Sequence, residues 1–264
     1  MEQSADPTVQ RRRLRVELRR ARGLAGFTQK QVADDLGWSP SKLLRIENGQ
    51  VGVSQTDLKA LLDHYDVKEP EQVRALTDMA QQGRRQQTWS HYRDVLGAEF
   101  IAYLSYENSA SLLRQTESLV VPGLLQTEEY ARVINKAWAS ADTTERDIER
   151  QTEARMLRQT ILDRADAPEM FFVLDEAAVR RWVGTRPGDA KIMVRQLARL
   201  QELNDMPKVR IQVLPYSHGF HFGLQGSFAM LEFPDPEDDE LLFLDNRASS
   251  VTAREGSDLI GRYK

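Results

Sequence analysis

The sequence predicts an α+β multidomain protein: a five-helix bundle over residues 1–82, then an α+β domain over residues 96–264 with a small, mostly antiparallel sheet. Apolar residues recur at helical spacing up to about residue 80, a pattern typical of packed helices. A polar stretch without periodicity follows, so we interpret residues 83–95 as a linker or joint. Strand-like segments come only in the last third of the chain, and helices followed by strands favour an α+β fold.

The composition is that of a globular protein of one large or two ordinary domains, with 264 residues. The mean hydropathy of −0.54 and the lack of a long apolar run exclude a membrane span. Nothing in the chain resembles a signal peptide. Zero cysteines exclude disulfides, thiolate nucleophiles and cysteine-based zinc sites, and they fit a reducing compartment. We therefore expect a cytoplasmic protein.

Charge is distributed unevenly along the chain. The net charge is −4, but residues 1–50 carry ten Lys and Arg against six Asp and Glu, a balance of +4. The other 214 residues therefore carry −8. A basic end on an acidic body is typical of a protein that binds nucleic acid at one end and something else at the other.

The first helix is expected to begin near Val9 and to bury Leu14 and Leu18. Its seven arginines are compatible with phosphate contact and equally with a solvated helix face, and the sequence leaves both readings open. A fourth helix is expected after Ser54 and a fifth from about Pro70.

Between the first and fourth helices, the pattern predicts two short helices joined by a glycine turn. Thr28 can cap the first of these helices, and Gly37 can adopt the positive φ that ends it. Ser39 can cap the second, with Pro40 at its first position. This arrangement is the helix-turn-helix, a motif that places its second helix in the major groove of DNA. The outer face of that helix carries the residues we expect to read bases: Ser41, Lys42 and Arg45.

The segment also resembles the Xre family, the phage Cro and repressor type of helix-turn-helix. The matching positions are Gln29, Ala33, Gly37 and the run Arg45-Ile46-Glu47-Asn48-Gly49. The resemblance implies that Gln29 and Asn48 contact DNA phosphates and that Glu47 pairs with an arginine of the preceding helix, for which Arg22 is suitably placed. It also implies a homodimer on a roughly palindromic operator. Pro40 departs from the family pattern, which often has a polar residue there.

In the second part, helices are expected to precede most of the strands. The pattern predicts helices over residues 99–113, 127–138, 144–163, 176–183 and 189–203, and strands over residues 170–174, 209–214, 228–233 and 241–244.

Several short runs in this part resemble an uncharacterised domain that is attached to Xre-type helix-turn-helices in actinobacterial regulators. The runs are Tyr106-Glu107, residues 121–127, Tyr130-Ala131, residues 174–178 and residues 212–215. Members are described as antitoxin-like or as developmental regulators, often encoded beside a very small protein. The resemblance implies such a partner here, whereas the residues themselves indicate a turn and a helix cap that serve folding.

No catalytic or metal-binding pattern stands out. His218 and His221 lie in one loop without the further ligands that zinc needs. The acidic run at residues 237–240 lacks the glycine and the ligand spacing of a calcium loop. No phosphate-binding glycine loop or nucleophile elbow is visible. We therefore expect neither an enzyme nor a bound metal or cofactor.

These observations predict a sequence-specific transcriptional regulator that binds double-stranded DNA and whose second domain binds a small partner protein or an effector. Two alternatives remain open: the antitoxin of a toxin–antitoxin pair, and an enzyme activity in the second domain. A toxic product of a small neighbouring gene would favour the first alternative, and a cofactor that purifies with the protein would favour the second.

The end of the chain looks like the start of another helix. Residues 257–264 begin like a capped amphipathic helix and stop after about two turns. We therefore expect that residue 264 is not a natural domain edge.

Overall fold

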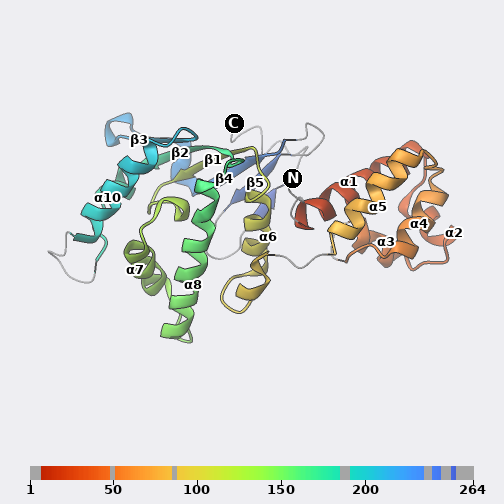
Figure 1. The fold of residues 1–264 in the computed structure, drawn as a ribbon, viewed down its shortest axis with the longest axis horizontal. Helices are drawn as coiled ribbons and strands as arrows, with labels where there is room; N and C mark the ends of the chain where they lie inside the picture. Colours follow the sequence, from red (N-terminus) through yellow and green to blue (C-terminus); the bar gives the residue numbers. More distant parts are fainter. Residues whose placement is uncertain are drawn as a thin grey trace. The chain divides into compact units, whose positions relative to one another are not determined.

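The structure is a computed structural model that describes residues 7–47, 51–84, 88–184, 191–234, 240–244 and 251–253. It contains two compact units, residues 1–90 and 91–264 (Figure 1). No helix within the described ranges is both long and apolar enough to cross a membrane. The expected helical start at residues 257–264 lies outside these ranges.

The N-terminal unit is a bundle of helices whose ends follow the local signals in the sequence. Its helices are α1 Pro7–Leu24, α2 Gln29–Asp35, α3 Pro40–Glu47, α4 Gln55–His64 and α5 Pro70–Gln82. Thr28 caps α2 in a capping box with Gln31, and Ser54 caps α4 by accepting from the Asp57 N–H at 2.9 Å. Gly37, which follows α2, has a φ of +64°, the left-handed conformation that ends a helix.

One apolar core holds these helices together. Side chains from α1, α2, α3 and α4 are almost completely buried in it, including Leu18, Val32, Leu43, Ile46 and Leu61. Residues at the spacing of one helical face supply this core, so the amphipathic pattern alone accounts for the bundle. The outer faces of α2 and α3 stay free for polar side chains.

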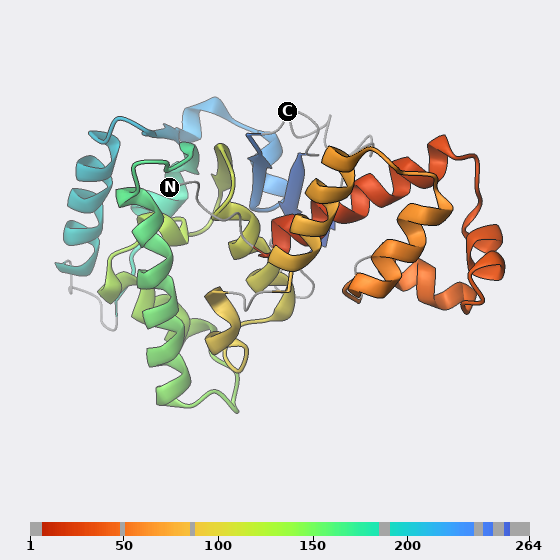
Figure 2. The same cartoon turned by 45° about the vertical axis from the view of Figure 1, so that its right-hand side comes forward.

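The C-terminal unit combines helices with a sheet (Figure 2). Its α-helices are α6 Ala98–Glu107, α7 Glu128–Trp138, α8 Glu145–Arg158, α9 Glu176–Arg180 and α10 Lys191–Asn204. Its strands are β1 Leu112–Glu117, β2 Glu169–Asp175, β3 Val209–Leu214, β4 Phe228–Glu232, β5 Leu241–Leu244 and β6 Val251–Ala253. Its short 3-10 segments are η2 Gly123–Leu125, η3 Gln159–Asp163, η4 Tyr216–His218 and η5 Phe222–Gln225, and η1 Thr88–Tyr92 spans the boundary between the two units.

The sheet is mixed, so the expectation of a mostly antiparallel sheet was wrong. The strand order is β3-β2-β1-β4-β5-β6. β2 is parallel to both β1 and β3, whereas β1–β4, β4–β5 and β5–β6 are antiparallel. The parallel half follows from connectivity: α7 and α8 lie between β1 and β2, and α9 and α10 lie between β2 and β3. Such helical crossovers return the chain to the starting edge and make the next strand parallel.

The sequence pattern did not predict strand β1, because Leu112 and Leu113 continue the apolar spacing of the preceding helix. The helix expected over residues 99–113 ends at Glu107, and Asn108 closes it. β1 then runs through the centre of the sheet, with β2 on one side and β4 on the other. Hydrogen bonding on both sides lets a strand with mostly polar residues form there.

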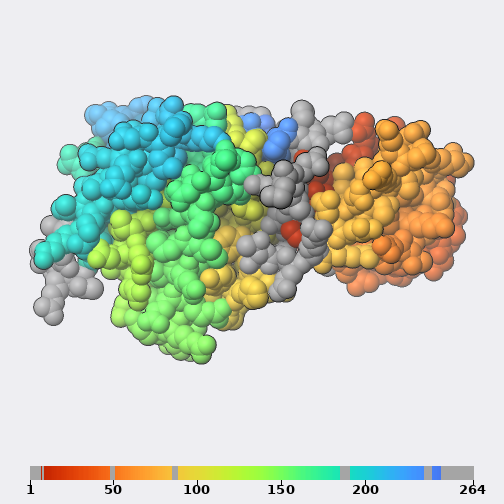
Figure 3. Space-filling view, in the orientation of Figure 1, coloured from red at the N-terminus to blue at the C-terminus, as the bar shows by residue number. Residues whose placement is uncertain are grey.

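Helices α6, α7 and α8 pack on one face of this sheet and enclose a cavity with it. Side chains alternate along β1, so Leu113, Gln115 and Glu117 share the face toward these helices. Helices α8 and α10 are both at the surface in the view of Figure 3, in green and cyan.

Candidate DNA-binding surface

The carboxylate of Glu47 lies at the meeting point of α1, α2 and α3. Arg22 on α1 donates to it twice, from Nε to Oε1 at 2.7 Å and from Nη2 to Oε2 at 3.1 Å. Gln29, the first residue of α2, donates from Nε2 to Oε2 at 2.5 Å. Glu47 is only 1% exposed. These contacts fix the end of α3 against the two helices that precede it.

Further hydrogen bonds strengthen this junction. Arg22 also donates from Nη1 to the Phe27 carbonyl at 2.9 Å, and Arg19 donates to the backbone carbonyl of Glu47. The hydrogen bond to Glu47 raises the pKa of Arg22, although burial opposes it. The guanidinium therefore stays charged, and the carboxylate is never left as an isolated buried charge.

The structure brings together Arg22 and Glu47, which the sequence predicted to form an ion pair, and Gln29, which it predicted to contact phosphate. Arg22 and Glu47 were expected to pair, and they lie in contact. Gln29 was expected to contact phosphate, and its amide nitrogen bonds Glu47 while its side chain is half-exposed. Asn48, the other expected phosphate contact, lies outside the described residues.

The expected base-reading residues have two different environments. Ser41 and Arg45 are exposed, one turn apart on α3, and Arg45 Nε donates to the Ser41 carbonyl at 3.3 Å. Lys42 instead lies against α4, with its Nζ 2.6 Å from Asp57 Oδ1 and 3.8 Å from the ring centroid of Trp38. Lys42 would have to exchange these contacts to reach a base.

Sequence reasoning missed Trp38 and Asp57 as parts of this surface. Asp57 is visible in the sequence as the third residue after the Ser54 cap, a position that favours acidic residues. Nothing in the local pattern links it to Lys42, because their contact depends on the packing of α3 beside α4.

The C-terminal unit contains a second buried ion pair, between α6 and α8. Arg158 donates from Nε to Glu107 Oε2 at 2.7 Å and from Nη2 to Oε1 at 2.5 Å, and the Tyr103 hydroxyl donates to Oε1 at 2.9 Å. Burial acts to lower the pKa of Arg158, but the attraction and hydrogen bonds of Glu107 outweigh it and raise the pKa. Burial also raises the pKa of Tyr103. Arg158 and Tyr103 are both hydrogen-bonded to Glu107 within this cluster, so we interpret the ion pair as one that stabilises the fold.

Motif residues around Val121 hold a turn in place. The Tyr130 hydroxyl accepts from the Val121 N–H at 3.1 Å, and Gln126 Nε2 donates to the Val121 carbonyl at 2.7 Å. Thr127 caps α7, and Gln196 Nε2 on α10 donates to the Leu125 carbonyl at 2.7 Å. These contacts give the run over residues 121–127 a role in folding.

Of the two loop histidines, His221 contacts an acidic side chain. His221 Nε2 lies 2.9 Å from Asp175 Oδ2, and Asp175 also caps α9 through the Ala177 N–H. Burial acts to raise the pKa of Asp175, but these two hydrogen bonds outweigh it and lower the pKa. Over the described ranges, no three His, Cys, Asp or Glu side chains are grouped as ligands for a metal ion.

Comparison with known families assigns both halves of the chain. A model described as a helix-turn-helix domain matches residues 13–76, which include α2 and α3. A model described as a domain of unknown function, DUF5753, matches residues 100–263. Neither a curated protein nor a solved structure matches the chain.

Proposed function

This chain belongs to the DUF5753 family and carries a helix-turn-helix domain, and we propose that it is a sequence-specific transcriptional regulator of the Xre type. In this proposal it binds double-stranded DNA as a homodimer on a roughly palindromic operator. Its C-terminal unit binds a small protein encoded nearby or an effector, and acts by binding rather than by catalysis.

The exposed face of α3 carries the DNA-binding proposal. Ser41 and Arg45 are exposed on it, while Leu43 and Ile46 on the opposite face are buried. Because its apolar face packs in the bundle and its polar face is exposed, α3 can enter the major groove without disturbing the core of the unit. Arg45 can then bond a guanine edge through two donors. The Glu47 junction supports the proposal because it holds α3 at a fixed angle to α2.

Exposed apolar side chains support binding of a protein by the C-terminal unit. They are concentrated after β3, where Phe220 is 80% exposed and Tyr216 and Leu224 are more than half-exposed. Exposed large apolar side chains that are close in the sequence are candidates for an interaction site. The acidic charge of this part of the chain is poorly suited to further DNA contacts.

The test of DNA binding is selection of genomic fragments by the purified protein, followed by affinity measurements at one salt concentration, since phosphate contacts make affinity salt-dependent. We expect a shared sequence among the selected fragments and at least about a thousandfold preference over random DNA. Arg132→Ala, a substitution at a half-exposed position on α7 in the C-terminal unit, is the control and should leave both affinities unchanged. Equal affinity for selected and random fragments would reject sequence-specific regulation.

The test of partner binding is the operator affinity with and without the product of the neighbouring small gene. A regulatory partner must bind the DNA-competent and DNA-incompetent forms unequally, with a coupling free energy of about 1–3 kcal/mol. An unchanged operator affinity at partner saturation would reject the coupling.

A further inference from the structure

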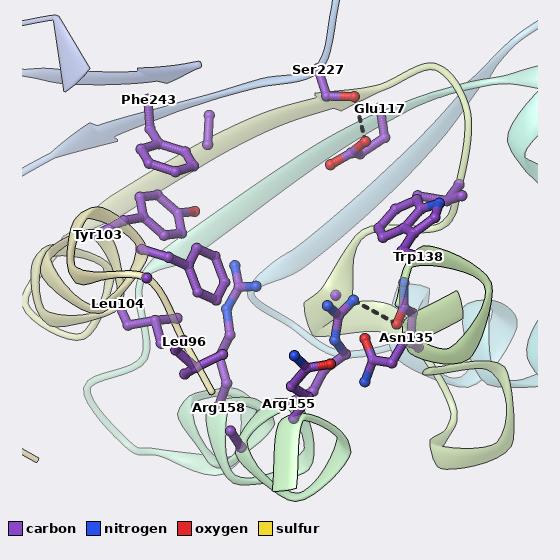
Figure 4. Close-up of a pocket in the computed structure, with 18 of the residues that line it drawn as sticks. Leu96, Tyr103, Leu104, Glu117, Asn135, Trp138, Arg155, Arg158, Ser227 and Phe243 are labelled. Carbon is purple, nitrogen blue, oxygen red and sulfur yellow. Dashed lines mark hydrogen bonds between the residues drawn. The ribbon is translucent and has the colours of Figure 1, made fainter. Parts of the chain in front are cut away.

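A cavity of about 490 Å³ lies in the C-terminal unit between the sheet and helices α6, α7 and α8 (Figure 4). Its volume is within the range of about 300–1,000 Å³ that is typical of small-molecule sites. β1 and β4 form its floor, and α8 contributes Arg155 and Arg158, which extend toward the floor. The motifs described above assign no ligand to it.

The charges around this cavity balance. Arg158, which lines the cavity, is paired with Glu107, and Arg155 Nη1 donates to Gln126 Oε1 at 2.9 Å. On the floor, Glu117 accepts hydrogen bonds from Gln115 Nε2 at 2.8 Å and Ser227 Oγ at 2.5 Å. The two positive charges of the arginines are thus balanced by the two negative charges of Glu107 and Glu117. An added ionic group would enter a partly dry site as an extra charge, so the cavity favours a neutral ligand.

One buried acceptor on the floor is unused. Gln115, which lines the cavity, has an Oε1 atom that is almost fully buried and has no hydrogen-bond partner within the described part of the chain. Because Gln115 Nε2 must face the Glu117 carboxylate, the orientation of the amide is fixed and Oε1 remains an acceptor. A buried carbonyl oxygen without a donor has lost its hydrogen bond to water and gained none in return, which destabilises the fold. A ligand that supplies an O–H or N–H group at this point would restore that hydrogen bond.

Aromatic side chains form the wall opposite α7. The rings of Tyr103 and Phe243 are stacked with centroids 4.3 Å apart, and Phe100 lies 5.9 Å from Tyr103. At another part of the lining, Leu119 and Trp138 are 61% and 41% exposed although both border the cavity. Apolar residues that reach from the cavity to the surface provide an entrance for an apolar molecule. Flat aromatic walls favour a flat aromatic ligand through offset or edge-to-face contacts.

We propose that this cavity binds a neutral, planar aromatic small molecule whose hydroxyl or N–H group donates a hydrogen bond to Gln115 Oε1. The proposal deepens the proposed function by naming the class of effector, and it rests on that function for the regulatory consequence of binding. Occupancy of the cavity would bridge β1 to α6 and α8, the elements that carry its polar and aromatic walls.

The experiment uses the full chain and isothermal titration calorimetry with matched probes, in the absence of DNA. The probes are 2-naphthol with 2-methoxynaphthalene, indole with 1-methylindole, and the anion 2-naphthoate. Each pair has nearly the same shape but differs in the donor. We expect at least one donor probe to bind about tenfold more tightly than its methylated analogue, since one hydrogen bond is worth about 1.4 kcal/mol here. We expect 2-naphthoate to bind more weakly than 2-naphthol.

Variants locate the binding site. Gln115→Leu should remove the difference between a donor probe and its methylated analogue, whereas Gln201→Leu, on the exposed side of α10, should preserve it. Ala154→Phe, at a buried position that lines the cavity, should reduce the affinity for every probe by filling the space. If either variant fails to fold, the comparison of probes on the unaltered chain still decides the proposal.

Three outcomes would overturn the proposal: neither 2-naphthol nor indole binds, each binds no better than its methylated analogue, or 2-naphthoate binds best. Because this titration contains no DNA, its failure would leave the DNA-binding proposal standing. Conversely, failure of the fragment selection would reject the regulator and leave the titration as a test of the cavity alone.

Discussion

Arg22 and Glu47, 25 residues apart in the sequence, join α1 to the end of α3 through two parallel hydrogen bonds. The carboxylate is buried, and removal of one partner leaves the other charge without compensation. We expect Arg22→Met or Glu47→Gln to lower the free energy of unfolding of the N-terminal unit by about 3–5 kcal/mol.

A double-mutant cycle in chemical denaturation measures this coupling. The double variant should lose less than the two single variants together. Arg20→Met, which removes an arginine from an exposed contact with Glu17 on the same helix, is the control and should cost less than about 1 kcal/mol. Full additivity in the cycle would contradict the pairing.

Gly37 is expected to be more sensitive to substitution than Gly23, although a methyl group at either position meets no atom within 4 Å. The φ of +64° at Gly37 is unfavourable for alanine, so Gly37→Ala should cost about 1–2 kcal/mol. Gly23 lies in α1, where Gly23→Ala should stabilise by up to about 1 kcal/mol. Thermal melts of the two variants make the comparison, and a shift of the same sign in both would show that backbone conformation is not the cause.

The sequence predicted the ends of an element correctly where a local signal, such as a helix cap or a change from apolar to polar residues, marks them. The helix expected over residues 127–138 spans Glu128–Trp138, and the strand expected over residues 241–244 spans Leu241–Leu244. A threonine cap marks the first, and an apolar run before a polar stretch marks the second. Such signals act within a few residues, so one sequence carries them completely.

The features that were missed depend on contacts between distant parts of the chain. β1 forms because β2 and β4 are hydrogen-bonded to it on its two sides, and the residues of β1 alone do not indicate that these partner strands exist. Lys42 was assigned to base reading from its place on α3, yet Asp57 and Trp38 contact it in the folded unit. Likewise, Arg19 was read as a phosphate contact or part of a solvated face, and it donates to the backbone carbonyl of Glu47.

The pair between Arg158 and Glu107 should be far more important for stability than the exposed pair between Arg114 and Glu232. Their side chains are 7% and 2% exposed in the first pair, against 48% and 33% in the second. Arg158→Met should lower the free energy of unfolding of the C-terminal unit by about 3–5 kcal/mol, because Glu107 would stay buried without its partner.

Arg114→Met is the matched control, since it makes the same chemical change in the same sheet-containing unit. We expect it to cost less than about 1 kcal/mol. Urea unfolding of both variants gives the two values, and similar losses would mean that burial does not determine the strength of the Arg158 pair.

Acid should weaken the contact between Lys42 and Asp57. Burial acts to raise the pKa of Asp57, but hydrogen bonds from Lys42 and Ser54 outweigh it, so the pKa lies below its ordinary value of 3.8. A lowered pKa in the folded state means that ionised Asp57 stabilises the fold above pH 3.8, and that this contribution is lost as the pH falls through the folded pKa.

We therefore expect Asp57→Asn to lower the Tm at pH 7 and to have a smaller effect at pH 3. The transition of the N-terminal unit can be identified by its response to Leu61→Ala, a core substitution in that unit. Asp63→Asn, on the exposed side of the same helix, is the control and should leave the Tm at pH 7 unchanged. An equal effect of Asp57→Asn at both pH values would contradict the ionic contribution.

Arg45 and Gln29 should affect DNA binding in different ways, because one faces outward on α3 and the other is bonded to Glu47. A guanidinium that bonds a base edge contributes only on the right sequence, so Arg45→Ala should cost about 1–3 kcal/mol on the operator and much less on random DNA. Gln29→Ala should weaken both by a similar factor, since a phosphate contact carries no sequence information. The measurement is affinity for both DNAs at one salt concentration, with the Tm of Gln29→Ala recorded to separate DNA contact from the lost Glu47 bond. Equal losses on operator and random DNA for Arg45→Ala would remove Arg45 from the base-reading residues.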